Sequence, residues 1–118
     1  MQEPRAVVEC ENVLRSLNIT FQRNAPIAPT PRKLWDFAFT HNGKNYVLDY
    51  HMRGFKNPYI GESPLYTNKT HAALRHDYCV ILILRSDKVR TDIETALAGT
   101  DTLYTSDPEF TATTLSKL

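Results

Sequence analysis

The pair Asn42-Gly43 lies between two runs in which apolar and polar residues alternate, and it constrains the fold of this chain more than any other feature. A two-residue type I′ turn needs a positive φ at both central positions, which asparagine and glycine tolerate best. The pattern therefore predicts a β-hairpin with one strand on each side of the turn. Counting outward from the turn places Asp36 opposite Asp49.

This register divides the hairpin into two faces, because successive side chains of a strand point to opposite sides of the sheet. One face is expected to carry the apolar side chains of Trp35, Phe37, Phe39, Tyr46, Leu48 and Tyr50. The other face is expected to carry Asp36, Ala38, Val47, Asp49 and His51. Like charges placed opposite one another destabilise a strand pair. Either these two carboxylates splay apart in water, or a divalent cation such as Mg²⁺, which proteins typically hold with one or two carboxylates, lies between them.

Length and composition predict one globular domain over residues 1–118, with a loosely packed tail over 106–118. Of the 118 residues, 42% are hydrophobic and 23% are charged, which is ordinary for such a domain. The formal net charge of +1 argues against a broad, charge-driven coat on nucleic acid. Two cysteines, Cys10 and Cys79, are too few for a disulfide framework or a four-ligand zinc site. Because neither a secretion signal nor a membrane-spanning run is present, we expect an intracellular protein, cytoplasmic or nuclear, with no membrane partner.

Hydrophobic periodicity and turn residues predict the element order αβββαβαβ. The expected elements are helices over 4–17, 63–77 and 86–98 and strands over 19–21, 35–41, 44–51, 78–84 and 102–105. The run over 78–84 is continuously apolar, which is typical of a central strand covered on both faces. The inward face of the second helix is expected to carry Leu65, Lys69, Ala72, Ala73 and His76.

A helix with a glutamate, a hairpin with two acidic residues, and then a helix and a buried strand resemble the PD-(D/E)xK nuclease superfamily, most closely its very-short-patch-repair and restriction-endonuclease-like members. Trp35-Asp36-Phe37 resembles the segment that carries the family's first metal-binding aspartate. Tyr46-Val47-Leu48-Asp49-Tyr50-His51 resembles the next strand, with His51 where a lysine is usual. Lys69-Thr70-His71-Ala72 and the apolar run after it resemble the helix and strand that follow, so the resemblance extends from about Glu9 to Arg85. It implies a restriction-endonuclease-like α/β fold, with a mixed β-sheet flanked by α-helices.

The resemblance also implies roles for individual residues. Asp36 and Asp49 would bind Mg²⁺ or Mn²⁺, and a glutamate of the first helix, Glu11 rather than Glu9, would add a ligand. In the family a lysine helps to position or deprotonate the attacking water. Two substitutes are open here: His51 accepts the proton, or Lys69 supplies the charge from the second helix. A metal held in this way lowers the pKa of its bound water and neutralises charge that develops on the phosphate.

These features predict a metal-dependent nuclease that hydrolyses phosphodiester bonds, in DNA more than in RNA. The basic residues expected to contact the nucleic acid are Arg32, Lys33, Arg53 and Lys56. The alternative is a catalytically inactive module with the nuclease fold that binds nucleic acid or a protein partner. A homodimer, or a larger parent protein that completes the site, is compatible with either function.

Overall fold

The helices and strands follow one another in the order αβββαβαβ, as the sequence predicts. The computed structural model describes residues 5–27, 30–51, 64–84, 88–99 and 102–106. The helices are α1 (Arg5–Ser16), α2 (Pro64–Arg75) and α3 (Val89–Ala98), and the strands are β1 (Phe21–Ile27), β2 (Thr30–His41), β3 (Lys44–His51), β4 (Tyr78–Leu84) and β5 (Leu103–Thr105).

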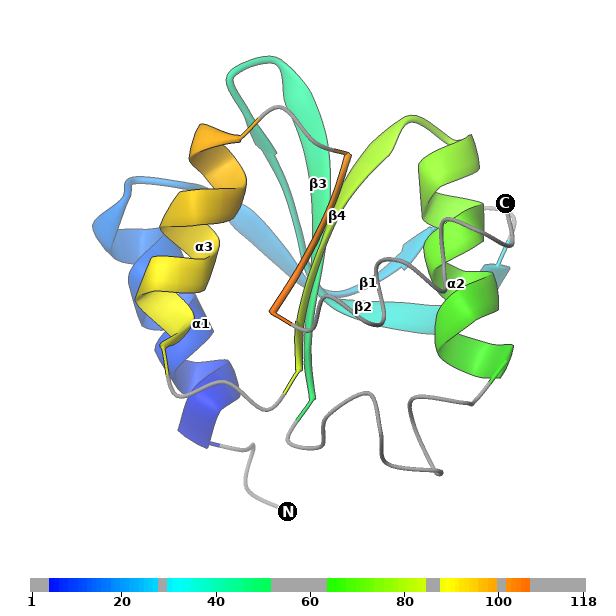
Figure 1. Ribbon diagram of the computed structural model, residues 1–118, viewed down its shortest axis with the longest axis horizontal. Coiled ribbons are helices and arrows are strands. Elements are labelled where there is room, and N and C mark those ends of the chain that lie inside the picture. Colours follow the sequence, from blue (N-terminus) through cyan, green and yellow to red (C-terminus); the bar gives the residue numbers. More distant parts are fainter. Residues whose placement is uncertain (1–4, 28–29, 52–63, 85–87, 100–101, 107–118) are drawn as a thin grey trace.

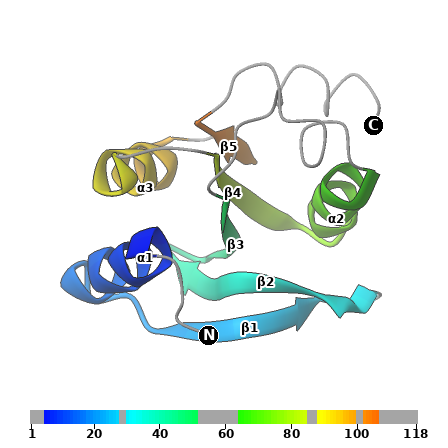
Figure 2. The ribbon, with the colours of Figure 1, turned by 90° about the horizontal axis from the view of Figure 1, so that it is seen from below.

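The five strands form one mixed sheet, with helices on both faces (Figure 1). The strand order is β1-β2-β3-β4-β5, in which β2 is antiparallel to both neighbours and β3, β4 and β5 are parallel. Seen from below, α1 and α3 lie on one side of the sheet and α2 on the other (Figure 2). The predicted α/β class and the mixed sheet flanked by helices are therefore confirmed. No helix in the described parts of the chain is long and apolar enough to span a membrane.

The β2–β3 hairpin has the predicted turn and register. Asn42 and Gly43 adopt φ angles of 51° and 76°, as a type I′ turn requires. The facing pairs run from His41 and Lys44 at the turn to Phe37 and Leu48. Because one face of this hairpin fills the main core, a slip of one residue would expose the whole apolar set.

Two apolar clusters lie on the two faces of the sheet. The larger lies under α1 and α3 and includes Val7, Cys10, Leu14, Phe37, Phe39, Tyr46, Leu48, Ile81, Ile83 and Ile93. The smaller lies on the α2 side and consists of Trp35, Val47, Ala73, Val80 and Leu103. β4 contributes to both clusters, which explains its continuous apolar run.

The structure corrects the predicted face of Trp35. Strict alternation puts Trp35 beside Phe37, but Trp35 packs in the α2 cluster while Phe37 packs in the cluster under α1. The side-chain alternation of β2 therefore changes phase at Asp36, between these two aromatic residues.

Several element boundaries also differ from the prediction, among them the start of β2, which lies at Thr30 and not at Trp35. The first strand runs from Phe21 to Ile27, because Pro26 lies on an edge strand, where a missing backbone N–H is tolerated. α2 ends at Arg75, so His76 leaves the helix and is exposed. Thr70 and His71 are buried instead of His76.

We predict that the turn depends on Gly43 for backbone reasons alone. Gly43→Ala creates no clash, since nothing lies within 4 Å of an added Cβ, but it strains a φ of +76°. The free energy of unfolding should fall by about 1 kcal/mol. Gly99→Ala is the matched control, because Gly99 has a φ of −80° and should accept alanine without loss. Equal losses in urea denaturation of both variants would contradict this explanation.

We also predict that Cys10 is inert in the native protein. Burial, aided by the nearby Asp36 and Glu9 carboxylates, raises the pKa of the Cys10 thiol to about 12. Because the thiolate is the reactive form, alkylation at pH 8 in a Cys79→Ala variant should be about 1,000-fold slower than in the denatured chain. Mass spectrometry of iodoacetamide-treated protein measures this rate, and labelling of the folded variant at the denatured rate would refute the prediction.

Candidate functional site

Asp36 and Asp49 meet where β2 and β3 separate. The Asp36 backbone N–H donates to Asp49 Oδ1 at 2.7 Å. In return, the Tyr50 backbone N–H donates to Asp36 Oδ2 at 3.0 Å. The paired ladder of the two described strands ends at Phe37 and Leu48, so these side chains satisfy backbone groups that lose a strand partner. These bonds hold the two aspartates together one position beyond the last facing pair, although the predicted direct pairing of Asp36 with Asp49 is not among the facing pairs.

Lys69 joins this pair from α2. Its ammonium Nζ donates to Asp49 Oδ2 and also to the Leu34 backbone carbonyl. The same Nζ lies 4.4 Å from the centre of the Trp35 ring, within range of a cation–π contact. Only 7% of Lys69 is exposed, so the predicted inward position of this lysine is confirmed.

Electrostatics at Asp49 are unfavourable for an isolated carboxylate. Burial is the largest influence and raises the pKa of Asp49 to about 7, the charge of Asp36 adds to it, and the Lys69 ammonium opposes it. Only 4% of Asp49 is exposed, so water does little to stabilise its charge. The ionised form of Asp49 therefore depends on a neighbouring cation.

The chemistry of this donor set fits a hard divalent cation. A carboxylate offers about four lone-pair sites on two oxygens, so the three hydrogen bonds described for the two aspartates leave positions for a metal. Mg²⁺ commonly takes one or two carboxylates and completes its shell with water and phosphate oxygens. In the described part of the chain no group of three or more His, Cys, Asp or Glu side chains gathers. A cation held by Asp36 and Asp49 would therefore have to take its other ligands from water or substrate.

The predicted third ligand, Glu11, does not join the pair. Its carboxylate lies 2.7 Å from the Arg15 guanidinium and 3.5 Å from that of Arg23, so two arginines neutralise it. Glu9 lies on the exposed side of α1. The amphipathic pattern of the helix could not reveal this, because Arg23 reaches Glu11 from a different element.

Several predicted site residues fall outside the description of the structure. The backbone of His51 pairs with Leu84 in the β3–β4 ladder, but the His51 side chain is not described. Arg32 and Lys33 belong to β2, and their side chains are likewise undescribed. Arg53 and Lys56 lie outside the described residues altogether. The roles given to these residues stay predictions.

Arg23 also belongs to this site, although the sequence did not predict a role for it there. Its Nε donates to the Asp36 backbone carbonyl at 3.1 Å, and its guanidinium lies 4.7 Å from the centre of the Phe37 ring. The sequence pattern that could have placed Arg23 here is its alternation with Phe21 on one face of a strand. This pattern is visible only when the first strand is extended to Ile27.

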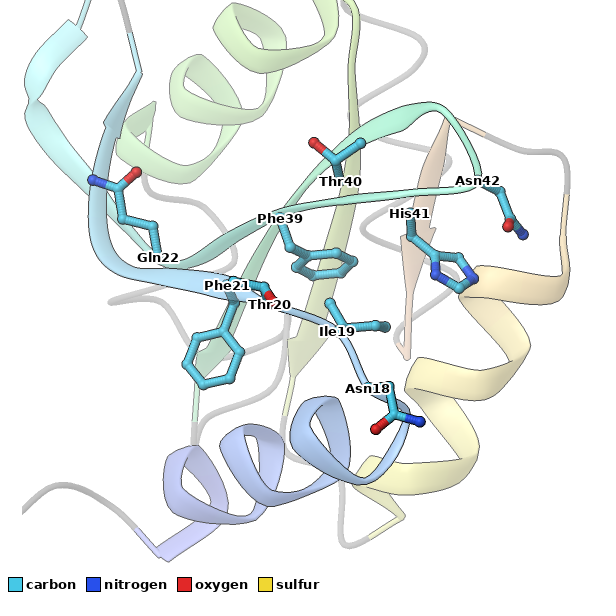
Figure 3. A pocket seen from close by; sticks show the side chains of 9 residues that line it. All are labelled: Asn18, Ile19, Thr20, Phe21, Gln22, Phe39, Thr40, His41 and Asn42. Carbon is cyan, nitrogen blue, oxygen red and sulfur yellow. The ribbon is translucent and has the colours of Figure 1, made fainter.

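A separate hollow of about 590 Å³ lies beside the hairpin turn (Figure 3). Its lining consists of residues 18–22, between α1 and the start of β1, and residues 39–42, at the end of β2 and in the turn. Neither of the two aspartates nor Lys69 lines this hollow. The carboxylate pair is therefore a distinct site, farther along the hairpin from the turn.

Comparison of the chain with protein-family models, with curated proteins and with solved structures found no match. Function must therefore be inferred from the chemistry of the chain itself. The strongest chemical feature of the described residues is the cluster of Asp36, Asp49 and Lys69, which unites two strands and a helix.

We predict that Lys69 and Asp49 stabilise the fold only as a pair. Lys69→Met leaves a buried carboxylate without its ammonium, so the free energy of unfolding at pH 8 in EDTA should fall by about 3–5 kcal/mol. Because burial then raises the pKa of Asp49 without the opposing Lys69 charge, the folded variant takes up a proton that the unfolded chain lacks. Stability of the variant should therefore increase from pH 8 to pH 5.

Chemical denaturation at both pH values measures these effects. The control is Arg90→Met, which removes an exposed ion pair with Glu94 and an exposed hydrogen bond to Ser16 and should change stability by less than about 1 kcal/mol. The double variant Asp49→Asn/Lys69→Met should lose less than the sum of the two single variants. Additive losses would show that the two groups do not interact.

Proposed function

We propose that this chain is a metal-dependent nuclease that hydrolyses phosphodiester bonds, in DNA more than in RNA. The observation that carries the proposal is a hydrogen-bonded cluster: the Asp49 carboxylate accepts from the Asp36 N–H and the Lys69 ammonium, and the Asp36 carboxylate accepts from the Tyr50 N–H beside Asp49. Two carboxylates suit a hard cation, and a neighbouring ammonium suits the anionic phosphate. The PD-(D/E)xK resemblance implies the same three groups, with the lysine on a strand; in this chain a helix supplies it.

The arrangement of elements around the cluster supports a restriction-endonuclease-like fold. The acidic residues lie on an antiparallel hairpin whose second strand, β3, pairs in parallel with the buried β4. α1 and α2 lie on opposite faces of the mixed sheet (Figure 2). Both features agree with the fold that the resemblance implies.

In the proposed site Asp36 and Asp49 hold Mg²⁺ or Mn²⁺. When bound, the ion supplies Lewis acidity and a bound water of lowered pKa. The protein's own contribution is orientation. The Asp49 carboxylate is fixed by the Asp36 N–H and the Lys69 ammonium, and the Asp36 carboxylate is fixed by the Tyr50 N–H, so little reorganisation is needed when substrate arrives.

Lys69 is the better supported of the two substitutes for the family lysine. Its Nζ contacts Asp49 directly, so it would lie near a cation and a phosphate held at that carboxylate. There a fixed positive charge would stabilise the negative charge that develops on the phosphate oxygens. The alternative substitute is His51, two residues after Asp49 on β3, acting as the proton acceptor.

The nucleic acid would approach along the basic residues that flank the acidic pair in sequence. Arg32 and Lys33 precede Asp36 on β2, and Arg53 and Lys56 follow Asp49. With a net charge of only +1, a local group of basic side chains has to provide the phosphate contacts. Substrate affinity should accordingly fall steeply with salt.

We predict that Mn²⁺ stabilises the protein and supports cleavage. Mn²⁺ at about 100 times its dissociation constant should raise the free energy of unfolding by about 2.7 kcal/mol, measured as a shift of the melting temperature. Linear and plasmid DNA should be cleaved in Mn²⁺ or Mg²⁺. Asp36→Asn and Asp49→Asn, which keep the shape of the side chains, should lose both the shift and about 100-fold or more of the cleavage rate.

The control is Glu94→Gln, an exposed acidic residue on α3 that should change neither quantity. Circular dichroism establishes that each variant is folded. A melting temperature that Mn²⁺ does not change, together with no cleavage of DNA or RNA, would refute the proposal. Metal binding without cleavage would instead indicate a site that a larger parent protein completes.

A further inference from the structure

Asn24 of the edge strand β1 lies across from Asp36, where the β1–β2 ladder is interrupted. A second irregularity lies farther along the strand, between Pro26 and Ile27. In the described parts of these strands, Arg23 pairs with Phe37 and Ala25 pairs with Trp35, but Asn24 and Asp36 are skipped. Asn24 has a φ of 50°, in the left-handed region that strand residues normally avoid. The backbone distortion of β1 therefore coincides with the position of the first aspartate.

Both strands change face at this point. On one side of it, Phe21 and Arg23 of β1 contact the Phe37 ring, which belongs to the core under α1. On the other side, Ala25 pairs with Trp35, whose ring packs in the α2 cluster. Residues two apart on a regular strand share a face, so the strand pair must rotate between Phe37 and Trp35. A residue in the left-handed region departs from the extended strand conformation and so turns the chain locally.

This rotation determines what Asp36 can contact. Its N–H turns away from regular strand pairing and donates to the Asp49 carboxylate. Its own carboxylate receives the Tyr50 N–H from the opposite strand. In an unrotated ladder, main-chain partners would occupy these N–H groups, and the two carboxylates would lose the donors that now hold them.

The residue type at position 24 suits this role. Asparagine adopts the left-handed region more readily than any β-branched residue, for which a positive φ is strongly unfavourable. Asn24 is exposed, so core packing does not explain its conformation. β1 lies at the edge of the sheet, so its distortion breaks no second ladder.

We propose that Asn24 is a positioning residue for the carboxylate pair: its left-handed backbone rotates the β1–β2 ribbon so that Asp36 meets Asp49. The geometric part of this inference is independent of the catalytic one. Its consequence for metal binding rests on the proposed function. In both parts Asn24 acts through Asp36 and makes no contact with substrate.

The test compares Asn24→Gly, which keeps the left-handed conformation accessible, with Asn24→Val, which opposes it. Amide resonances of Asp36 and Tyr50 in ¹H–¹⁵N spectra report the two reciprocal hydrogen bonds without metal. Asn24→Gly should leave both amide shifts in place and the Mn²⁺ dissociation constant within about twofold. Asn24→Val should move both amides upfield and raise that dissociation constant at least about tenfold.

The matched control is Asn18→Val. Asn18 also has a positive φ, 59°, but it follows α1, away from the carboxylate pair, so its substitution costs similar backbone strain without touching the ribbon. It should leave both amides and the Mn²⁺ dissociation constant unchanged. If Asn24→Val does not fold, Asn24→Ala takes its place as the milder opposing variant.

Each outcome decides a separate question. Unchanged Asp36 and Tyr50 amides in Asn24→Val, or equal movement of these amides in Asn18→Val, would overturn the positioning role. Wild-type protein that binds no Mn²⁺ would refute the proposed nuclease site, while the amide shifts would still decide whether Asn24 positions Asp36. Glycine rescue of both amides and Mn²⁺ affinity would support the full inference.

Discussion

The reciprocal hydrogen bonds between Asp36, Asp49 and Tyr50 are the interaction on which the rest of the site depends. They continue the contact between β2 and β3 beyond the last paired residues, with carboxylates in the place of main-chain oxygens. A carboxylate that accepts a main-chain N–H is held more rigidly than one in water. The same bonds therefore close the open end of the hairpin and fix the direction of both acidic groups. Lys69 completes this arrangement by balancing charge that the buried surroundings disfavour.

The sequence predicted those parts of the fold that depend on local chemistry. Asn42-Gly43 specified the turn and hence the hairpin register, and the apolar run over 78–84 specified the buried strand to the residue. Both predictions succeeded because a positive φ favours asparagine and glycine, and burial on both faces of a strand requires a continuous run of apolar residues. The proximity of the two aspartates followed from the register. The inward position of Lys69 followed from helical periodicity.

Contacts between distant segments could not be predicted in this way. No residue near Glu11 in the sequence indicates that Arg23, from another element, neutralises its charge. The change of face between Trp35 and Phe37 has its origin on the neighbouring strand, at Asn24, so inspection of β2 alone yields the wrong face for Trp35. Asn24 resembles any surface asparagine in sequence, and only its pairing partner gives it significance.

The edge of the sheet formed by β1 has a consequence for association between molecules. An exposed strand edge offers a row of unpaired main-chain groups to which a second chain can add. In β1 the left-handed Asn24 bends that row, and Pro26 has no N–H to contribute to it. The same irregularity that turns the ribbon toward the acidic pair should therefore discourage edge-to-edge stacking, so that a binding geometry and protection against aggregation share one short segment of the chain.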